Sequence, residues 1–281
     1  MSAQLERLRL LLQPLCRQGL CLAFSGGVDS TVVLAAAVSI PTEKPVQAVL
    51  FATQLHPPAE EKEAEKLCRE MGTTLTVLRV DEFSDPCILQ NPVDRCYHCK
   101  KLLFTTLRRH AQELAYPHCA DGTNADDLLQ YRPGLKALSE LSIISPLAQC
   151  GFSKAQVRAL ASELGLSVQA KPSSPCLATR LPYNTPITRQ ALSQIARGEA
   201  GLQSLGFAGC RVRLHGNIAR VEIPLIDFPR FLQQREAVVS MMKGIGFAYV
   251  TLDLEGFRSG SMDEPLGLKK QAGSGEETER T

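Results

Sequence analysis

The segment SGGVDS, residues 25–30, carries the strongest chemical signal in the chain. It follows an apolar strand pattern and opens a helical one. Gly26 and Gly27 let the backbone approach a phosphate closely, and a helix start presents unpaired N–H groups and a positive dipole end. Ser25 and Ser30 add hydroxyl donors. Because the segment lacks the Gly-Lys-Ser/Thr ending of common nucleotide triphosphatases, it predicts a polyphosphate site that does not hydrolyse the γ-phosphate.

Asp29 and a second acidic segment, ADGTNADD at residues 120–127, are expected to face one crevice. A carboxylate beside phosphates is unfavourable unless a cation or an N–H group lies next to it, so we predict Mg²⁺ near Asp29. The second segment follows a later strand pattern, and parallel strands end at the same edge of a sheet. Asp121, Asn124 and Asp127 are candidate ligands of metal or adenylate, with a turn and helix cap as the alternative. The predicted ATP-binding set is Ser25, Gly26, Gly27, Asp29, Ser30, Phe51, Gly122, Asn124 and Asp127.

Cys96 and Cys99 form a Cys-x-x-Cys pair at the start of a helical pattern. Such a pair is a redox dithiol, half of a zinc site, or two ligands of an iron–sulfur cluster. The redox interpretation needs a strand–helix unit directly before the pair, whereas a polar loop, residues 81–94, precedes it. Cys176 lies between prolines in KPSSPCLATRLPY, which restricts its loop. These three cysteines differ from the others, whose apolar or helical surroundings are typical of small buried side chains.

A hairpin that turns at Gly216-Asn217 would place Arg213 opposite Arg220 and Arg211 opposite Glu222. Like charges that face each other destabilise a strand pair, so this register predicts an anion between or near the arginines. A solvated strand face is the alternative.

The elements that must position these residues alternate strand and helix patterns to about residue 165, as in a parallel sheet covered by helices. Strands are predicted at 21–24, 46–52, 75–80, 118–121 and 142–145. Helices are predicted at 31–38, 59–71, 101–114 and 154–164, after an amphipathic helix at the N-terminus. The fold class is therefore α/β, a doubly wound parallel sheet with a smaller α+β C-terminal domain.

An irregular, proline-containing segment, residues 169–188, separates this region from a second set of elements. That set comprises a helix at 189–206, two strands joined at 216–217, a helix at 228–243 and a strand at 248–252. We predict a nucleotide-binding domain at 1–168, an interdomain segment with Cys176 at 169–188, a small domain for substrate or oligomerisation at 189–258, and a disordered tail at 259–281.

Composition excludes several classes of protein. The 281 residues include 44% hydrophobic and 21% charged residues, and a formal net charge of +2 is too small for a protein that coats nucleic acid. No run reaches the roughly 20 apolar residues of a membrane span, and the N-terminus lacks the apolar core of a signal peptide. The ten cysteines are scattered, which favours a reducing cytoplasm over a disulfide framework. We expect a small-molecule substrate, no nucleic acid, no membrane and a homo-oligomer.

Seven segments together resemble one known family. SGGVDS is similar to the pyrophosphatase loop (PP-loop) of N-type ATP pyrophosphatases. The matching segments are, in chain order, SGGVDS, DRCYHCK, ADGTNADD, YRPG, KPSSPCLATRLPY, RVRLHG and YVTLDLEGFRSGSM. This order resembles the ATP-dependent sulfur transferases of nickel-pincer cofactor biosynthesis, the LarE family associated with lactate racemase, from about residue 20 to 263.

The resemblance implies that ATP adenylates a carboxylate of pyridinium-3,5-biscarboxylic acid mononucleotide and that sulfur then displaces AMP. In one branch of the family the cysteine matching Cys176 gives up its own sulfur and becomes dehydroalanine. In the other branch three cysteines bind a 4Fe-4S cluster that carries an extra sulfide. Cys96, Cys99 and Cys176 match the second pattern.

Polar residues beyond Cys176 are further candidates for the site, from the hairpin register and from their place near Cys176. Arg211 and Arg213 are predicted to bind the phosphate of the substrate. Arg180 is a candidate for orienting a carboxylate, while Glu199 and Glu222 either enter the site or pair with the arginines. Two other functions remain open: a PP-loop enzyme with another acceptor, such as tRNA or an amide-forming substrate, and a non-catalytic nucleotide-binding iron–sulfur sensor. Enzymes of the same cofactor pathway are possible partners.

Overall fold

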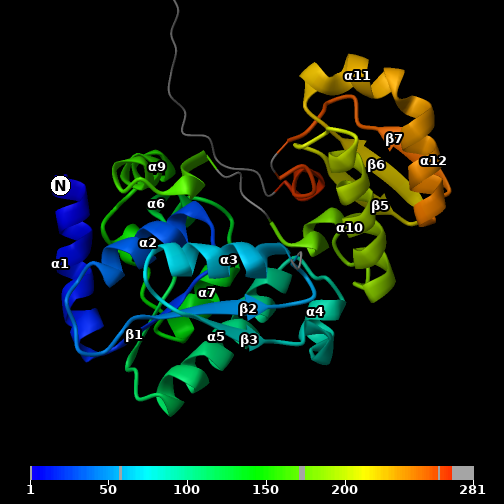
Figure 1. Cartoon of the computed structure of the whole chain (residues 1–281). Coiled ribbons are helices and arrows are strands. Elements are labelled where there is room, and N and C mark those ends of the chain that lie inside the picture. The colour runs from blue at the N-terminus through cyan, green and yellow to red at the C-terminus, as the bar shows by residue number, and fades with distance from the viewer. Residues whose placement is uncertain (1, 57–58, 171–174, 259, 268–281) are drawn as a thin grey trace, which may run out of the picture.

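The larger unit of the chain is built on a four-stranded parallel sheet (Figure 1). The computed structural model describes residues 2–56, 59–170, 175–258 and 260–267. The strands are β1 (Leu20–Ala23), β2 (Gln47–Ala52), β3 (Leu75–Arg79) and β4 (His118–Ala120), in the order β3-β2-β1-β4. The fifth strand expected at 142–145 is reduced to a single bridge, in which Ile144 extends the sheet beside Ala120.

Helices cover both faces of this sheet, which confirms the α/β class. They are α1 (Ala3–Gln18), α2 (Val28–Val38), α3 (Ala59–Glu70), α4 (Pro86–Leu89), α5 (Arg95–Glu113), α6 (Ala125–Leu128), α7 (Gly134–Glu140), α8 (Pro146–Gln149) and α9 (Lys154–Glu163), with the 3₁₀ helix η1 (Glu82–Ser84). Alternate residues of β2 point to opposite faces. Ala48 and Leu50 share a core with α1, α2 and α9, whereas Val49 packs with α5 and α7. Among the described helices, none has the length and apolar character that a membrane crossing needs.

The smaller unit contains a three-stranded sheet in the order β5-β6-β7. Its elements are η3 (Leu177–Arg180), α10 (Arg189–Ser204), β5 (Arg211–His215), β6 (Ile218–Glu222), η4 (Leu225–Asp227), α11 (Phe228–Gln233), α12 (Arg235–Ile245), β7 (Tyr249–Leu252) and η5 (Glu264–Leu266). The 3₁₀ helix η2 (Ser167–Ala170) still belongs to the larger unit, because Val168 packs in the same core as α9. β6 runs antiparallel to β5 and parallel to β7. The single helix expected at 228–243 is two helices that meet at Gln234, and both Phe231 and Met242 reach the same core.

The segment around Cys176 belongs to the core of the smaller unit. Leu177, Leu181 and Ile187 pack in this core, together with Leu55 and Ile88 from the larger unit. Backbone hydrogen bonds connect the same segment to the loop after β2 and to the end of α4: Leu177 N donates to Leu55 O at 2.8 Å, and Ile187 N donates to Leu89 O at 2.8 Å. Residues 175–188, a described part of the predicted interdomain segment, are therefore packed against both units, while residues 171–174 lie outside the described part of the chain.

The described part of the predicted tail, residues 260–267, differs from the disorder that we expected. Ser261 is buried and its hydroxyl donates to Glu222 Oε1 at 2.7 Å, while Tyr183 donates to Asp263 Oδ1 at 2.7 Å. This segment is held by hydrogen bonds and not by a periodic set of apolar side chains, so its order left no pattern in the sequence. Residue 259 and residues 268–281 lie outside the described part of the chain.

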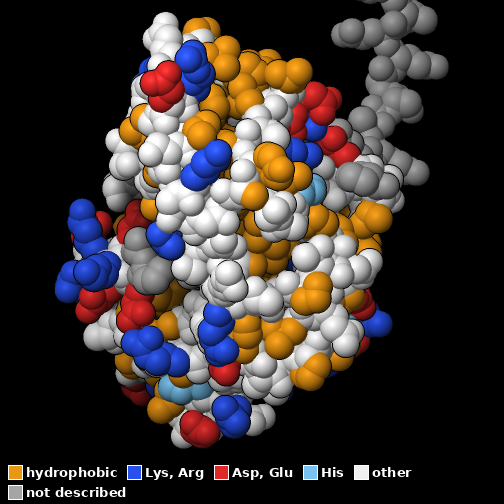
Figure 2. Space-filling model, turned by 90° about the vertical axis from the view of Figure 1, so that its right-hand side faces the viewer, with side chains coloured by type: hydrophobic (Ala, Val, Ile, Leu, Met, Phe, Trp, Pro, Cys, Tyr) orange, Lys and Arg blue, Asp and Glu red, His pale blue; other side chains and the backbone are white. Residues whose placement is uncertain are grey.

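The surface turned to the viewer in Figure 2 carries lysines and arginines next to acidic side chains, with hydrophobic side chains between them. On that face the charges are mixed instead of forming one basic surface. This mixture matches the small formal charge of +2.

We predict that Leu160→Ala lowers the free energy of unfolding by about 2–5 kcal/mol, because it leaves a cavity in the core under α9. Leu160 is 1% exposed. Leu10→Ala, on α1 and 61% exposed, is the matched control and should change it by less than about 0.5 kcal/mol. Urea unfolding followed by circular dichroism measures both. Equal losses in the two variants would contradict this placement of the core.

Candidate active site

The loop between β1 and α2 brings two hydroxyl groups to the start of a helix. Gly27 is the N-cap of α2, and Gly26 has a φ of +67°, the left-handed conformation that glycine adopts without strain. Ser30 Oγ lies 3.2 Å from Gly27 O, to which it donates, and 3.2 Å from Ser25 Oγ. The helix start and its hydroxyls have the arrangement expected of an anion site.

Lys154 provides the cation nearest to Asp29 in the structure. Its ammonium contacts Asp29 Oδ2, and Asn124 Nδ2 donates to Asp29 Oδ1 at 3.3 Å. None of the sequence motifs pointed to Lys154. The signal that could have revealed it is its position as the first residue of α9, directly after the N-cap Ser153, because helix starts lie near the carboxyl edge of a parallel sheet. The prediction of Mg²⁺ remains a prediction.

Gly122 brings the 120–127 segment into direct contact with the phosphate loop. A Cβ atom on Gly122 would lie 2.7 Å from Ser30 N, which is closer than atoms can pack, and 3.0 Å from Ser30 Cα, which is already a tight contact. Only glycine allows this approach. Residues 25–30 and 120–127 therefore lie in direct contact at one edge of the sheet.

The carboxylates of the 120–127 segment are already engaged within the protein. Asp121 Oδ1 accepts from Thr123 N at 3.1 Å and from Ser145 Oγ at 2.7 Å. Asn124 is the N-cap of α6 and forms a capping box with Asp127. Asp121 and Asp127 therefore make the contacts expected of a turn and a helix cap, which was the alternative to a ligand role. Asn124 reaches the phosphate loop by its hydrogen bond to Asp29.

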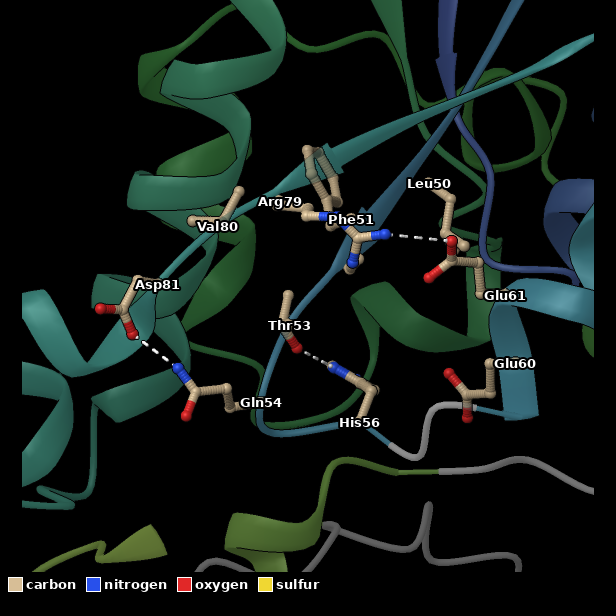
Figure 3. A pocket seen from close by; sticks show the side chains of 11 residues that line it. Leu50, Phe51, Thr53, Gln54, His56, Glu60, Glu61, Arg79, Val80 and Asp81 are labelled. Atoms are coloured by element: carbon tan, nitrogen blue, oxygen red, sulfur yellow. Dashed lines mark hydrogen bonds and ion pairs between the residues drawn. The ribbon is translucent and has the colours of Figure 1, made fainter.

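A cavity of about 360 Å³ lies at the ends of β2 and β3 (Figure 3). Its volume lies in the range of small-molecule sites. Gln54 Nε2 donates to Asp81 Oδ1 at 2.8 Å, and Thr53 Oγ1 lies 2.9 Å from His56 Nδ1 (Figure 3). Phe51 lines the cavity, while its ring packs edge-on against Phe104 with centroids 5.6 Å apart.

Helix α3 connects this cavity to the phosphate loop. Glu60 and Glu61 in its first turn line the cavity, and Ala64 one turn later packs against Gly26. Arg79 closes one side with an ion pair to Glu61 at 3.5 Å (Figure 3). A nucleotide whose phosphates bind at residues 25–30 would thus find room for its base and ribose at the cavity.

Cys96, Cys99 and Cys176 come from distant parts of the chain to one place. Cys96 is exposed, whereas Cys99 and Cys176 are half-buried. Burial raises the pKa of the Cys99 thiol, and the nearby Cys176, Glu82 and Cys96 raise it further. Burial also raises the pKa of the Cys176 thiol, against the opposing effect of Arg95. The three thiols therefore lie within electrostatic range of one another.

All ten cysteines are free, so thiol chemistry is available at this place. Among the residues that the structure describes, no group of three or more histidine, cysteine, aspartate or glutamate side chains is arranged to hold a single metal ion. A four-iron cluster is larger than one ion, and its ligands stand farther apart. Cysteine thiolates are the usual ligands of such a cluster, and three free thiols lie here. The presence of the cluster stays a prediction.

Arg180 and Glu199 form a buried pair that supports the backbone around Cys176. Arg180 Nε and Nη2 donate to the two oxygens of Glu199 at 2.9 and 3.0 Å. Arg180 Nη1 donates to Pro175 O at 2.8 Å and to Cys176 O at 3.2 Å. In the structure, the guanidinium predicted to orient a substrate carboxylate holds a carboxylate of the protein itself.

The hairpin has the predicted register, with Arg213 opposite Arg220 and Arg211 opposite Glu222. The anion between the arginines is Glu222: its Oε2 accepts from Arg213 Nη2 at 2.7 Å, and its Oε1 accepts from Arg220 Nη2 at 3.1 Å. The repulsion that suggested an external anion is thus offset within the chain. Sequence alone could not show this, because a strand register does not fix which side chains reach diagonally across it.

Arg211 differs from its neighbours because no described carboxylate forms an ion pair with it. It is half-buried, and its guanidinium carbon lies 5.2 Å from the centroid of the Phe257 ring. Burial lowers its pKa, and the nearby Arg180 and Arg213 act in the same direction while Glu199 opposes them. Arg211 is therefore the arginine of the hairpin best able to accept a new anionic partner.

This fold and this loop define a PP-loop ATP pyrophosphatase-type protein, and comparisons with known proteins agree. The family model described as NAD synthase matches residues 2–90. The chain is 39% identical to the pyridinium-3,5-bisthiocarboxylic acid mononucleotide synthase of Lactiplantibacillus plantarum, over 89% of this chain and 90% of that protein. Uncharacterized proteins of Synechocystis sp. and Methanocaldococcus jannaschii are 37% identical over 95% of the chain and 32% identical over 85%. They are covered to 99% and 90% of their length.

The chain belongs to the family of pyridinium-3,5-bisthiocarboxylic acid mononucleotide synthases, the LarE family. The resemblance that the seven segments indicated is thereby confirmed.

We predict that Gly122→Ala weakens ATP binding about 10-fold or more, because the new Cβ displaces the start of α2 from the phosphates. Gly244→Ala on α12 is the control, since no atom lies within 4 Å of the place its methyl group would take and alanine favours the helix. Titration calorimetry with ATP measures both variants. Unchanged ATP affinity in Gly122→Ala would show that this contact does not shape the nucleotide site.

Proposed function

We propose that this chain uses ATP to activate a carboxylate of pyridinium-3,5-biscarboxylic acid mononucleotide and then replaces a carboxylate oxygen with sulfur. The observation that carries this proposal is a link between the thiols and the phosphate loop. Lys100, next to Cys99, places its ammonium 3.7 Å from Asp121 Oδ2, and the neighbouring Gly122 packs on Ser30. Adenylation and sulfur delivery can therefore take place in one crevice.

In the first step an oxygen of the substrate carboxylate attacks the α-phosphorus of ATP, and pyrophosphate leaves. The start of α2 and the hydroxyls of Ser25 and Ser30 would hold the leaving pyrophosphate. Lys154 offers a positive charge beside it, and Asp29 offers a carboxylate for Mg²⁺. The product is an acyl adenylate, in which AMP has become a good leaving group.

In the second step sulfur attacks the carbonyl carbon of the acyl adenylate, and AMP leaves with one of the former carboxylate oxygens. Cys176 can serve this step as a ligand of the sulfur carrier or as the attacking thiolate itself, and in both cases Arg180 fixes its carbonyl oxygen and the backbone before it. The 2.8 Å bond from Leu177 N to Leu55 O ties Cys176 to the loop after β2, which also borders the cavity.

For the sulfur source we propose a 4Fe-4S cluster held by Cys96, Cys99 and Cys176. When bound by three thiolates, such a cluster supplies one open iron that can carry an additional sulfide. The proximity of three free thiols from two segments supports this choice. The second candidate is sacrificial transfer of the Cys176 sulfur, which needs neither Cys96 nor Cys99.

We further propose that Arg211 and Arg213 bind the phosphate of the substrate. The half-buried Arg211 has no carboxylate partner in the described part of the chain, and Arg213 lies on the same strand face. Arg213 also donates to Thr179 O at 3.0 Å, three residues beyond Cys176. A phosphate bound here would therefore be close to the segment that carries the thiol.

The proposed reaction places the chain in nickel-pincer cofactor biosynthesis and, in organisms with lactate racemase, in the maturation of that enzyme. A cytoplasmic homo-oligomer is part of the same proposal. A PP-loop enzyme with another acceptor, or a sensor without catalysis, would share the phosphate loop and the cysteines. Pyrophosphate release that depends on the pyridinium dicarboxylate mononucleotide separates these alternatives.

We predict that Asp29→Ala and Ser30→Ala each reduce adenylate formation by about 100-fold or more, because both groups act on the phosphates. Ser39→Ala at the far end of α2 is the control, since its hydroxyl donates to Ala36 O away from the loop. Isotope exchange between pyrophosphate and ATP in the presence of the substrate is the measurement. If exchange persists in both loop variants, the assignment of the phosphate site is wrong.

We also predict that Cys96→Ala, Cys99→Ala and Cys176→Ala each remove the brown chromophore of anaerobically purified protein and abolish sulfur transfer. Adenylation should remain, because the thiols act after it. Cys87→Ala, an exposed cysteine outside the site, is the control. Active Cys96→Ala and Cys99→Ala variants, with spent wild-type protein that has lost the mass of hydrogen sulfide at Cys176, would replace the cluster by the sacrificial mechanism.

A further inference from the structure

Arg95 is a buried cation at the point where the two thiol-bearing segments meet. It is the first residue of α5 and is 3% exposed. Its Nη2 donates to Cys96 Sγ at 3.7 Å, and its Nη1 donates to Ala178 O at 3.3 Å and to the side-chain oxygen of Asn91. One guanidinium thus contacts the Cys-x-x-Cys helix and the segment that follows Cys176.

Asn91 extends this connection on the other side of Arg95. It is fully buried and has a φ of +54°, an unfavourable conformation that its hydrogen bonds compensate. Its side-chain Nδ2 donates to Pro182 O at 2.8 Å, and its backbone carbonyl oxygen accepts from Asn184 N at 2.8 Å. Arg95 and Asn91 together hold the start of α5 against both ends of the 178–184 stretch.

The oxygen atoms that accept hydrogen bonds from Arg95 are neutral, so they do not balance its positive charge. Burying a cation without a partner is strongly unfavourable, and among the described residues no carboxylate forms an ion pair with it. The groups within its electrostatic range are the thiols of Cys176 and Cys96 and the Tyr183 phenol. Arg180, by contrast, has Glu199 as a buried counter-charge. The buried positive charge of Arg95 is therefore balanced best when the sulfur atoms at Cys96 and Cys176 carry negative charge.

We propose that Arg95 is a positioning residue that holds Cys96 next to the Cys176 segment and supplies the fixed positive charge for anionic sulfur at this site. This role rests on the proposed sulfur-transfer function, although the contact of Arg95 with the thiols can be tested without the reaction. A guanidinium serves both purposes because its planar fork contacts two segments at once while its charge faces the thiols.

The test compares alkylation of Cys96 by anionic iodoacetate and by neutral iodoacetamide in the full-length protein, freed of bound metal by a chelator. Both reagents need an accessible thiolate, so their rate ratio cancels exposure and ionisation and reports the local charge. Peptide mass spectrometry assigns the rates to each cysteine. In wild-type protein the iodoacetate-to-iodoacetamide ratio at Cys96 should exceed that at Cys87, which is also exposed but lies beside Asp85.

Arg95→Gln, which keeps a donor but loses the charge, should lower the ratio at Cys96 about 3- to 10-fold, the effect of one unit charge at close range in water. Arg95→Lys should retain most of the ratio, and Arg108→Gln, which removes another α5 arginine with a bond to Leu141 O, should leave it unchanged. An unchanged ratio in Arg95→Gln overturns the proposal. If that variant does not fold, a wild-type ratio at Cys96 no higher than at Cys87 overturns it as well.

The outcome is independent of the proposed reaction. Substrate-dependent pyrophosphate release by wild-type protein is measured in parallel. If it is absent while the Cys96 ratio follows the charge at Arg95, the proposed function fails and the role of Arg95 in the thiol site remains. If release is normal and the ratio ignores Arg95, the inference fails alone.

Discussion

The backbone contact between Gly122 and Ser30 joins the loops on which the rest of the site depends. It fixes the 120–127 segment against the start of α2, where unpaired N–H groups favour an anion. From there Asn124 reaches Asp29, and Asp121 lies near the Lys100 ammonium. A side chain at residue 122 would push these loops apart, so one glycine links the phosphate site to the helix that carries Cys96 and Cys99.

The segment after Cys176 shows how buried polar contacts replace an ordinary linker. Arg180 is neutralised by Glu199, and the same guanidinium binds the carbonyl oxygens of Pro175 and Cys176. Such a buried ion pair adds little net stability, because both charged groups lose their hydration. Its two hydrogen bonds nevertheless hold the guanidinium in one orientation. We infer that its role is to fix one conformation of the thiol-bearing backbone between the two units.

The arginines of the hairpin are neutralised in a similar way. Glu222 is fully buried, yet each of its oxygens has a partner, in Arg213 on one side and in Arg220 and Ser261 on the other. The C-terminal stretch that contains Ser261 therefore helps to set the charge on the strand face. A phosphate arriving at this face would meet Arg211 first, because Glu222 already occupies the other two arginines.

The sequence by itself determined the α/β class, the phosphate loop, the hairpin register and the family, because glycine spacing and side-chain alternation are local patterns with few solutions. Tertiary structure decided the partners of the charges. Lys154 at Asp29, Glu222 between the arginines and Arg95 beside the thiols join residues that are far apart in the chain. Polar partners over such separations leave no periodic signal, since only the packing of the two units decides which side chains meet.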